Sequence, residues 1–399
     1  MEWIKGGVLA PKGFRASGVR SGIKKWARDL GLLTSETPAV AAAVFTTNRV
    51  QAAPVLVTRR HLKSGRLQAV IVNSGNANCC TGPRGLRDAK RMAALAAKSL
   101  GIPQGRVAVC STGIIGSFLP MERIERKIPA LVSDLSRNAH LEFTESILTT
   151  DRKMKEAAVR FRIGNATGTI GAVCKGAGMI HPRMATMLCF ITTDVAIDRR
   201  PLQRLLSQLC SGTFNRITVD GDMSTNDTVL LLANGSCGNR TIDSTASPSF
   251  KTFEKALASV MEDLARKIVA DGEGATQVAK VIVTGAKNES EALRVCRSVA
   301  NSKLVKTALF GRDPNWGRIA ASVGASGAAF DPVKLSIGLG NIWFFRRGNP
   351  ITSVRNLKGI FHQNPVQIRV DLGAGSSRAS MLTCDLTEEY VRINAHYRS

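Results

Sequence analysis

A single threonine, Thr186, stands where a loop containing glycine and proline meets an apolar, β-rich segment in KGAGMIHPRMATMLCFITTD, residues 175–194. A hydroxyl held in a rigid turn can attack the carbonyl carbon of the residue before it, and water then hydrolyses the resulting ester. The threonine thereby gains a free α-amine with a reference pKa of about 7.7–8.0, which can act as the base for its own hydroxyl. The stretch therefore allows cleavage between Ala185 and Thr186, but a threonine that opens a strand is usually a simple β-former.

Four glycine-rich turns follow apolar segments and could surround such a hydroxyl. Their peptide N–H groups can bind an anion or stabilise a developing oxyanion, although such turns also occur simply as tight turns. The turn in CSTGIIG, residues 110–116, places Thr112 beside Gly113 and could supply an oxyanion hole. The other three turns lie in residues 73–82, 219–228 and 271–276.

Other kinds of catalytic or metal site find little support in the sequence. We find no GxSxG elbow and no Walker or dinucleotide fingerprint, and the nine cysteines and five histidines lack zinc-ligand spacing. Asp220, Asp222 and Asp227 are close enough in sequence to coordinate a divalent cation, but they lack the EF-hand spacing. Turn capping is the better interpretation of these three residues, and we predict no metal site.

The composition is that of a globular protein with a strongly basic surface. The 399 residues carry a formal net charge of +25, while only 5% of them are aromatic, and the basic residues form no block of five. A surface that attracts small acidic molecules is therefore favoured over a nucleic-acid site. We identify no secretory signal and no apolar run long enough to span a membrane, and the isolated cysteines fit reduced thiols in the cytoplasm.

The elements that would position these residues alternate between short β-like segments and amphipathic helices. Strands are expected at residues 39–48, 53–58 and 67–75, and helices at 86–100 and 253–269, where apolar side chains recur every three or four positions. Because strands are often joined by turns rather than by helices, this α/β pattern favours sheets stacked between helix layers over a Rossmann fold.

Nine motifs, taken together, resemble those of the glutamate N-acetyltransferase/ornithine acetyltransferase family of arginine biosynthesis. They occur in the family's order and the resemblance spans residues 8–399. The motifs are APKGFRASG, VFTTN, NSGNAN, CSTGIIG, KGAGMIHPRMATML, DGDMSTNDT, ADGEGAT, FGRDPNWGRI and CDLTEEYVRINAHY.

The resemblance implies an α/β, layered αββα sandwich of the DmpA-like and ornithine acetyltransferase-like type. Self-cleavage would produce an α chain, residues 1–185, and a β chain, residues 186–399, which are intertwined and assembled as an α2β2 heterotetramer. Thr186 would accept the acetyl group of N2-acetylornithine and pass it to glutamate in a ping-pong reaction. The family's oxyanion hole corresponds to Thr112 and Gly113.

The resemblance also implies a set of substrate-binding residues. Lys175 is chemically suited to a substrate α-carboxylate, and Glu273 is suited to an ammonium group. No cofactor is expected, although acetyl-CoA as a second acetyl donor is left open. The substrate-binding positions are Thr149, Lys175, Thr186, Glu273, Asn394 and Ser399.

The sequence leaves two alternatives to the acetyltransferase open. One is an N-terminal-nucleophile aminopeptidase or amidase on the related fold, in which water replaces glutamate as the acceptor. The other is a basic nucleic-acid-binding or scaffold protein that is neither cleaved nor catalytic. Appearance of fragments that begin at Thr186 would separate the enzymes from the scaffold.

Overall fold

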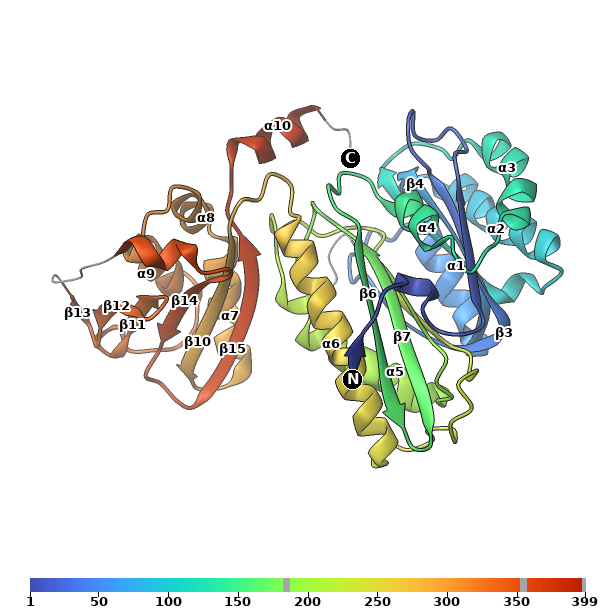
Figure 1. The fold of residues 1–399 in the computed structure, drawn as a ribbon. Helices are drawn as coiled ribbons and strands as arrows, with labels where there is room; N and C mark the ends of the chain where they lie inside the picture. The colour runs from blue at the N-terminus through green and yellow to red at the C-terminus, as the bar shows by residue number, and fades with distance from the viewer. Residues whose placement is uncertain (182–186, 352–356, 397–399) are drawn as a thin grey trace.

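The computed structural model describes residues 1–181, 187–351 and 357–396, in which two β-sheets carry helices packed against them (Figure 1). Three residues that the sequence analysis assigned to the site, Ala185, Thr186 and Ser399, lie outside the described residues.

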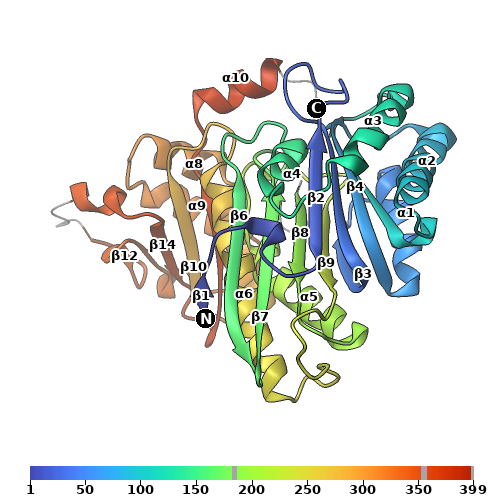
Figure 2. The same ribbon diagram turned by 45° about the vertical axis from the view of Figure 1, so that its right-hand side comes forward.

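The larger sheet has nine strands within the described residues. Figure 2 shows the succession from β6 and β7 through β8 and β9 to β3 and β4. In spatial order the strands are β1 (Glu2–Trp3), β6 (Lys155–Ile163), β7 (Ala166–Lys175), β8 (Leu188–Thr193), β9 (Thr228–Ala233), β3 (Leu30–Phe45), β4 (Arg66–Asn76) and β5 (Val107–Ile114), with β2 (Phe14–Val19) also paired with β3.

The long strand β3 joins the two halves of this sheet. Its first part pairs with β2 and β4, and its last part, from Val40 to Phe45, pairs with β9. The register with β4 shifts between Thr34 and Ala39, and Pro38 lies in this irregular stretch. A proline has no N–H to donate to a sheet, so it is tolerated at such a bulge, where the strand changes partners.

Helices cover the outer face of both halves of the sheet. α1 and α2 pack on β5, while α5 packs on β3 and α6 packs on β6 and β7. The inner face carries a separate apolar cluster that includes Val70, Val72, Phe190 and Leu230, and α4 lies over β2 and β3 on this side. The mixed α/β sandwich predicted from the sequence is thus confirmed. The helices are α1 (Ala53–His61), α2 (Gly82–Leu100), α3 (Met121–Ser133), α4 (His140–Ile147), α5 (Arg199–Gly212) and α6 (Pro248–Ala270).

The smaller sheet has its own apolar core and is followed by a helix, α10 (Glu388–His396), that leads back toward the larger part (Figure 1). In spatial order its strands are β13 (Asn349–Pro350), β12 (Ile342–Arg346), β11 (Ser336–Leu339), β14 (Val366–Asp371), β10 (Val278–Ala286) and β15 (Ser377–Cys384). Its helices are α7 (Glu289–Asn301), α8 (Lys303–Phe310) and α9 (Trp316–Gly324). Short 3₁₀ turns occur in both parts of the chain. They are η1 (Gly7–Leu9), η2 (Leu62–Ser64), η3 (Gln104–Arg106), η4 (Phe214–Arg216), η5 (Pro332–Lys334) and η6 (Leu357–His362).

The strand expected at residues 53–58 is wrong, because this segment begins helix α1. Val55 and Val57 are buried on either side of Leu56, which is 44% exposed, so these three residues by themselves alternate as in a strand. Short apolar runs are ambiguous in this way. Tertiary contacts decide in favour of the helix: Thr58 Oγ1 donates to Val109 O at 2.7 Å and accepts from Val109 N at 2.8 Å on the edge strand β5.

Strands from both sides of position 185 share the larger sheet. β7 pairs with β8 in an antiparallel arrangement, and β3 pairs with β9. Residues 1–185 and 186–399 are therefore not separate structural units. Within the described ranges, none of the helices is both long enough and apolar enough to cross a lipid bilayer.

Candidate active site

The turn at Thr112 and Gly113 lies at the end of β5, where this strand runs parallel to the end of β4. Gly113 is paired with Gly75 and has a φ of +130°. A β-carbon at position 113 would lie 2.3 Å from the carbonyl carbon of Gly75 and 2.5 Å from the peptide nitrogen of Asn76. Only glycine fits this position, because both the backbone conformation and the space exclude a side chain.

Lys175, the last residue of β7, reaches this turn from the other half of the sheet. Its side chain is buried, and its Nζ donates to Thr112 Oγ1 at 3.1 Å. Burial lowers the pKa of Lys175 below its usual value, and the carboxylate of Asp151 partly opposes this shift. Because Thr112 Oγ1 accepts from the lysine, its own hydroxyl proton is left to point at another acceptor.

A buried ion cluster supports the backbone beside Lys175. Lys155 Nζ lies 2.7 Å from Asp151 Oδ1 and 2.5 Å from Asp271 Oδ2, and all three side chains are at most 4% exposed. Asp151 also accepts hydrogen bonds from the peptide N–H groups of Gly176 at 2.7 Å and Thr149 at 3.1 Å. Burial by itself would raise the pKa of Asp151, but the neighbouring lysine ammonium groups outweigh it and lower the pKa to about 2.

Glu273 and Asn394 form a second polar group near the same loop. Asn394 Nδ2 donates to Glu273 Oε2 at 2.8 Å, and Glu273 N donates to Ala177 O at 2.9 Å. Gly178 faces the carboxylate so closely that a β-carbon there would lie 2.6 Å from it. The glycines of KGAG thus let the loop after Lys175 pass close to Glu273.

Both ends of the segment 182–186 are anchored in the described structure. On one side, Asp220 accepts hydrogen bonds from Met179 N at 2.6 Å and Ile180 N at 3.0 Å. Met179 has a φ of +52°, which is unusual for a residue other than glycine and is held in place by this carboxylate. On the other side, Met187 N donates to Asp227 Oδ1 at 2.9 Å.

Four residues that take part in this arrangement were missed as site residues. The sequence favours turn capping for Asp220 and Asp227, and both accept backbone N–H groups, one on each side of residues 182–186. No sequence pattern points to Asp151. It pairs with Lys155 four positions later, but residues 151–154 form a bend and not a helix, so no helical charge pattern reveals the pair. Lys24 also approaches the site: its Nζ donates to Leu148 O at 2.9 Å, and burial lowers its pKa to about 8.

The predicted site residues that the structure describes form three groups. Lys175 contacts Thr112 beside Gly113, and Glu273 pairs with Asn394. Asp151 accepts hydrogen bonds from the peptide N–H groups of Thr149 and of Gly176, the residue after Lys175. Ala185, Thr186 and Ser399 lie outside the described residues, so their placement stays a prediction. Within residues 1–181, 187–351 and 357–396 no cluster of three or more metal-ligating side chains occurs.

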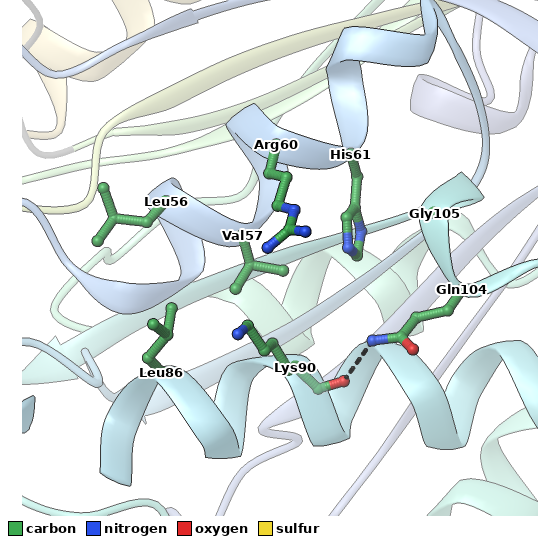
Figure 3. Close-up of a pocket in the computed structure, with 8 residues that line it drawn as sticks. All are labelled: Leu56, Val57, Arg60, His61, Leu86, Lys90, Gln104 and Gly105. Carbon is green, nitrogen blue, oxygen red and sulfur yellow. Dashed lines mark hydrogen bonds between the residues drawn. The ribbon is translucent and has the colours of Figure 1, made fainter. Parts of the chain in front are cut away.

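A separate surface pocket of about 540 Å³ lies away from these residues, between α1, α2 and η3 (Figure 3). Leu56, Val57 and Leu86 supply its apolar lining, and Arg60 and Lys90 line it with basic side chains (Figure 3). Since none of the predicted site residues lines this pocket, it is not part of the candidate active site.

Comparison with known proteins places the chain in a family. The sequence model of the ArgJ family matches residues 15–399. An arginine biosynthesis bifunctional protein ArgJ from Symbiobacterium thermophilum is 48% identical over 403 aligned residues, which cover 100% of both chains. Another protein of this name, from Bacillus cereus (strain ZK / E33L), is 47% identical over 99% of this chain and 97% of the relative.

Two solved structures are also similar in sequence over part of the chain. A crystal structure of the ArgJ protein from Bacillus halodurans is 45% identical and covers 47% of this chain and 97% of that chain, with a TM-score of 0.44. An ornithine acetyltransferase from Mycobacterium tuberculosis, solved in complex with ornithine, is 42% identical and covers 45% of this chain and 97% of that chain, with a TM-score of 0.43.

The protein is an enzyme of the mixed α/β class: the sheets and helices give the class, and the relatives of similar sequence give the enzyme. The chain belongs to the ArgJ family. The family predicted from the nine sequence motifs is thereby confirmed, as is the prediction that the protein is an enzyme.

Proposed function

We propose that the protein cleaves itself between Ala185 and Thr186 and then moves the acetyl group of N2-acetylornithine to glutamate through an acetyl ester on Thr186. The observation that carries this proposal is the contact of Lys175 Nζ with Thr112 Oγ1 beside Gly113. It joins the loop that leads to Thr186 to a turn with a free hydroxyl donor and a peptide N–H, the two groups that an oxyanion needs.

Self-cleavage begins when Thr186 Oγ1 attacks the carbonyl carbon of Ala185. The acyl group passes from the nitrogen to the oxygen, and water hydrolyses the ester to leave a carboxylate on Ala185 and a free amine on Thr186. The anchored flanks at Ile180 and Met187 support this step, because an attack on the preceding carbonyl requires a constrained turn.

In the transfer reaction the Thr186 amine accepts the hydroxyl proton, and Oγ1 attacks the acetyl carbonyl carbon of N2-acetylornithine. The Thr112 hydroxyl and the Gly113 N–H donate to the oxyanion, and ornithine leaves with the proton on its nitrogen. The amine of glutamate then attacks the acetyl ester, which releases N-acetylglutamate and restores the Thr186 hydroxyl.

The charges near the turn suit these substrates. Lys175 is the buried cation that would bind an α-carboxylate, and Glu273, oriented by Asn394, would bind the side-chain ammonium of ornithine. Thr149 and Ser399 complete the proposed binding set. Acetyl-CoA as a second donor, the α2β2 assembly and a cytoplasmic location belong to the same proposal, which needs no cofactor.

The proposal is tested by following the chain on a denaturing gel and by measuring ornithine release with and without glutamate. We expect two fragments that meet at Ala185 and Thr186, and ornithine release that depends on glutamate. Thr186→Ala should abolish both, whereas Thr252→Ala, on an exposed face of α6, should change neither. An intact wild-type chain would refute the mechanism, and release without glutamate would favour the amidase.

A further inference from the structure

Asp227 is a buried carboxyl group in direct contact with the residue that follows Thr186. It is 1% exposed, and its Oδ1 accepts the hydrogen bond from Met187 N at 2.9 Å. The carbonyl oxygen of Met187 accepts from Thr228 N at 3.1 Å. Both polar backbone groups of Met187 are therefore held before β8 begins at Leu188.

The loop that carries Asp227 also contacts the oxyanion strand. The neighbouring residue, Asn226, donates through Nδ2 to Ser111 O at 2.8 Å and to Ala77 O at 2.7 Å. The carbonyl oxygen of Asp227 accepts from Thr46 N at 3.0 Å. Residues 226 and 227 thus connect the start of β8 with the peptide bond that precedes Thr112.

The surroundings favour an uncharged acceptor at this position. Burial raises the pKa of Asp227 to about 8, while its hydrogen bonds and the ammonium group of Lys175 act in the opposite direction. Among the described residues its second oxygen, Oδ2, has no hydrogen-bond partner. A carboxyl group that is protonated near neutral pH still accepts from Met187 N through Oδ1.

We propose that Asp227 is a positioning residue for the nucleophile, since it fixes the backbone at Met187 relative to the oxyanion turn that Asn226 holds. This inference rests on the proposed role of Thr186. A merely structural capping aspartate would stabilise the fold without setting the rate of cleavage. A positioning aspartate controls the distance from the residue 186 hydroxyl to its target, and a misplacement of about 1 Å costs about 10²-fold in rate.

The test compares Asp227→Asn, which keeps an oxygen acceptor, with Asp227→Ala, which removes it. Asp222→Asn is the matched control, because Asp222 is exposed in the same loop. For each purified variant we would measure the rate of self-cleavage, the kcat and KM of the cleaved enzyme, and the thermal midpoint. We expect Asp227→Ala to lose about 10²-fold in cleavage rate and kcat with KM values within about threefold, and Asp227→Asn to recover most of the loss.

Three outcomes would overturn the proposal. In the first, folded Asp227→Ala cleaves itself at a rate, and works with a kcat, within threefold of the wild type. In the second, folded Asp227→Asn and Asp227→Ala lose equally in cleavage rate and kcat. In the third, only the KM of the variants changes. If Asp227→Ala does not fold, Asp227→Glu replaces it, because it keeps the acceptor but displaces it by one methylene. It should be slower than Asp227→Asn, and equal rates would refute the positioning role. A wild-type chain that stays intact would instead refute the proposed function.

Discussion

Replacing Gly113 with alanine should disable the oxyanion turn, and Gly116 in the same turn region provides a matched control. Both glycines have a positive φ, +130° at Gly113 and +82° at Gly116, so alanine strains the backbone at either position. Such strain costs on the order of 1–3 kcal/mol of stability. The two positions differ in space: a β-carbon at Gly116 would meet nothing within 4 Å, whereas at Gly113 it would meet backbone atoms of β4.

The size of the effect follows from these contacts. The β-carbon at position 113 would lie 2.3 Å from the carbonyl carbon and 2.7 Å from the Cα of Gly75. Carbon atoms pack at about 3.5–4.0 Å, so one of the two strand ends has to move by about 1 Å. Loss of one oxyanion donor costs about 10²–10³ in kcat, which is about 2.7–4 kcal/mol. We therefore expect Gly113→Ala to be at least about 10²-fold slower than Gly116→Ala.

The assay measures glutamate-dependent ornithine release for equal amounts of cleaved enzyme, with the cleaved fraction read from a denaturing gel. Comparable thermal midpoints of the two variants would show that the difference in rate is not a difference in folding. If Gly113→Ala released ornithine within threefold of Gly116→Ala, the assignment of the oxyanion hole to this turn would be refuted.

Two further substitutions test the groups that surround the turn. Lys155→Met leaves the buried carboxylates of Asp151 and Asp271 without their cation, and we expect a loss of about 3–5 kcal/mol in the free energy of unfolding by denaturant titration. The pKa of Asp151 in the folded protein is lowered to about 2. The ionised carboxylate therefore stabilises the fold above its unfolded pKa of about 4, and this contribution is lost as the pH falls from about 4 toward 2. This dependence of stability on acid pH should weaken in Lys155→Met. Gly178→Ala should push the Glu273 carboxylate aside and raise the KM for N2-acetylornithine by about 10- to 100-fold, with kcat preserved.

Each of these two variants has a control of the same residue type whose substituted side chain lies in solvent. Lys153→Met removes an exposed lysine two positions away, and its stability should match the wild type. Gly212→Ala places a methyl group in open space at the end of α5, and its KM should not change. Equal losses in Lys155→Met and Lys153→Met would contradict the buried ion cluster, and an unchanged KM in Gly178→Ala would contradict the role of Glu273.

Local pattern and motif order determined much of the fold and part of the site. The apolar periodicity of residues 253–269 predicted α6, which spans Pro248–Ala270, because a helix that packs on a sheet buries one face. The motifs led to the family and to Thr112, Gly113 and Lys175, which the structure brings together. The strand predicted at residues 53–58 is wrong, because two valines on either side of a leucine fit a strand as well as a helix.

The sequence by itself determined the family, the α/β class and the residues with the capacity for chemistry, since these depend on residue type and on spacing along the chain. Only the tertiary structure showed that Lys155 pairs with Asp271, 116 positions away, and that Asp227 holds the residue after Thr186. Such contacts depend on which strands become neighbours in the sheet. No local pattern of charge or hydropathy encodes that choice, because it is made by the packing of the whole sandwich.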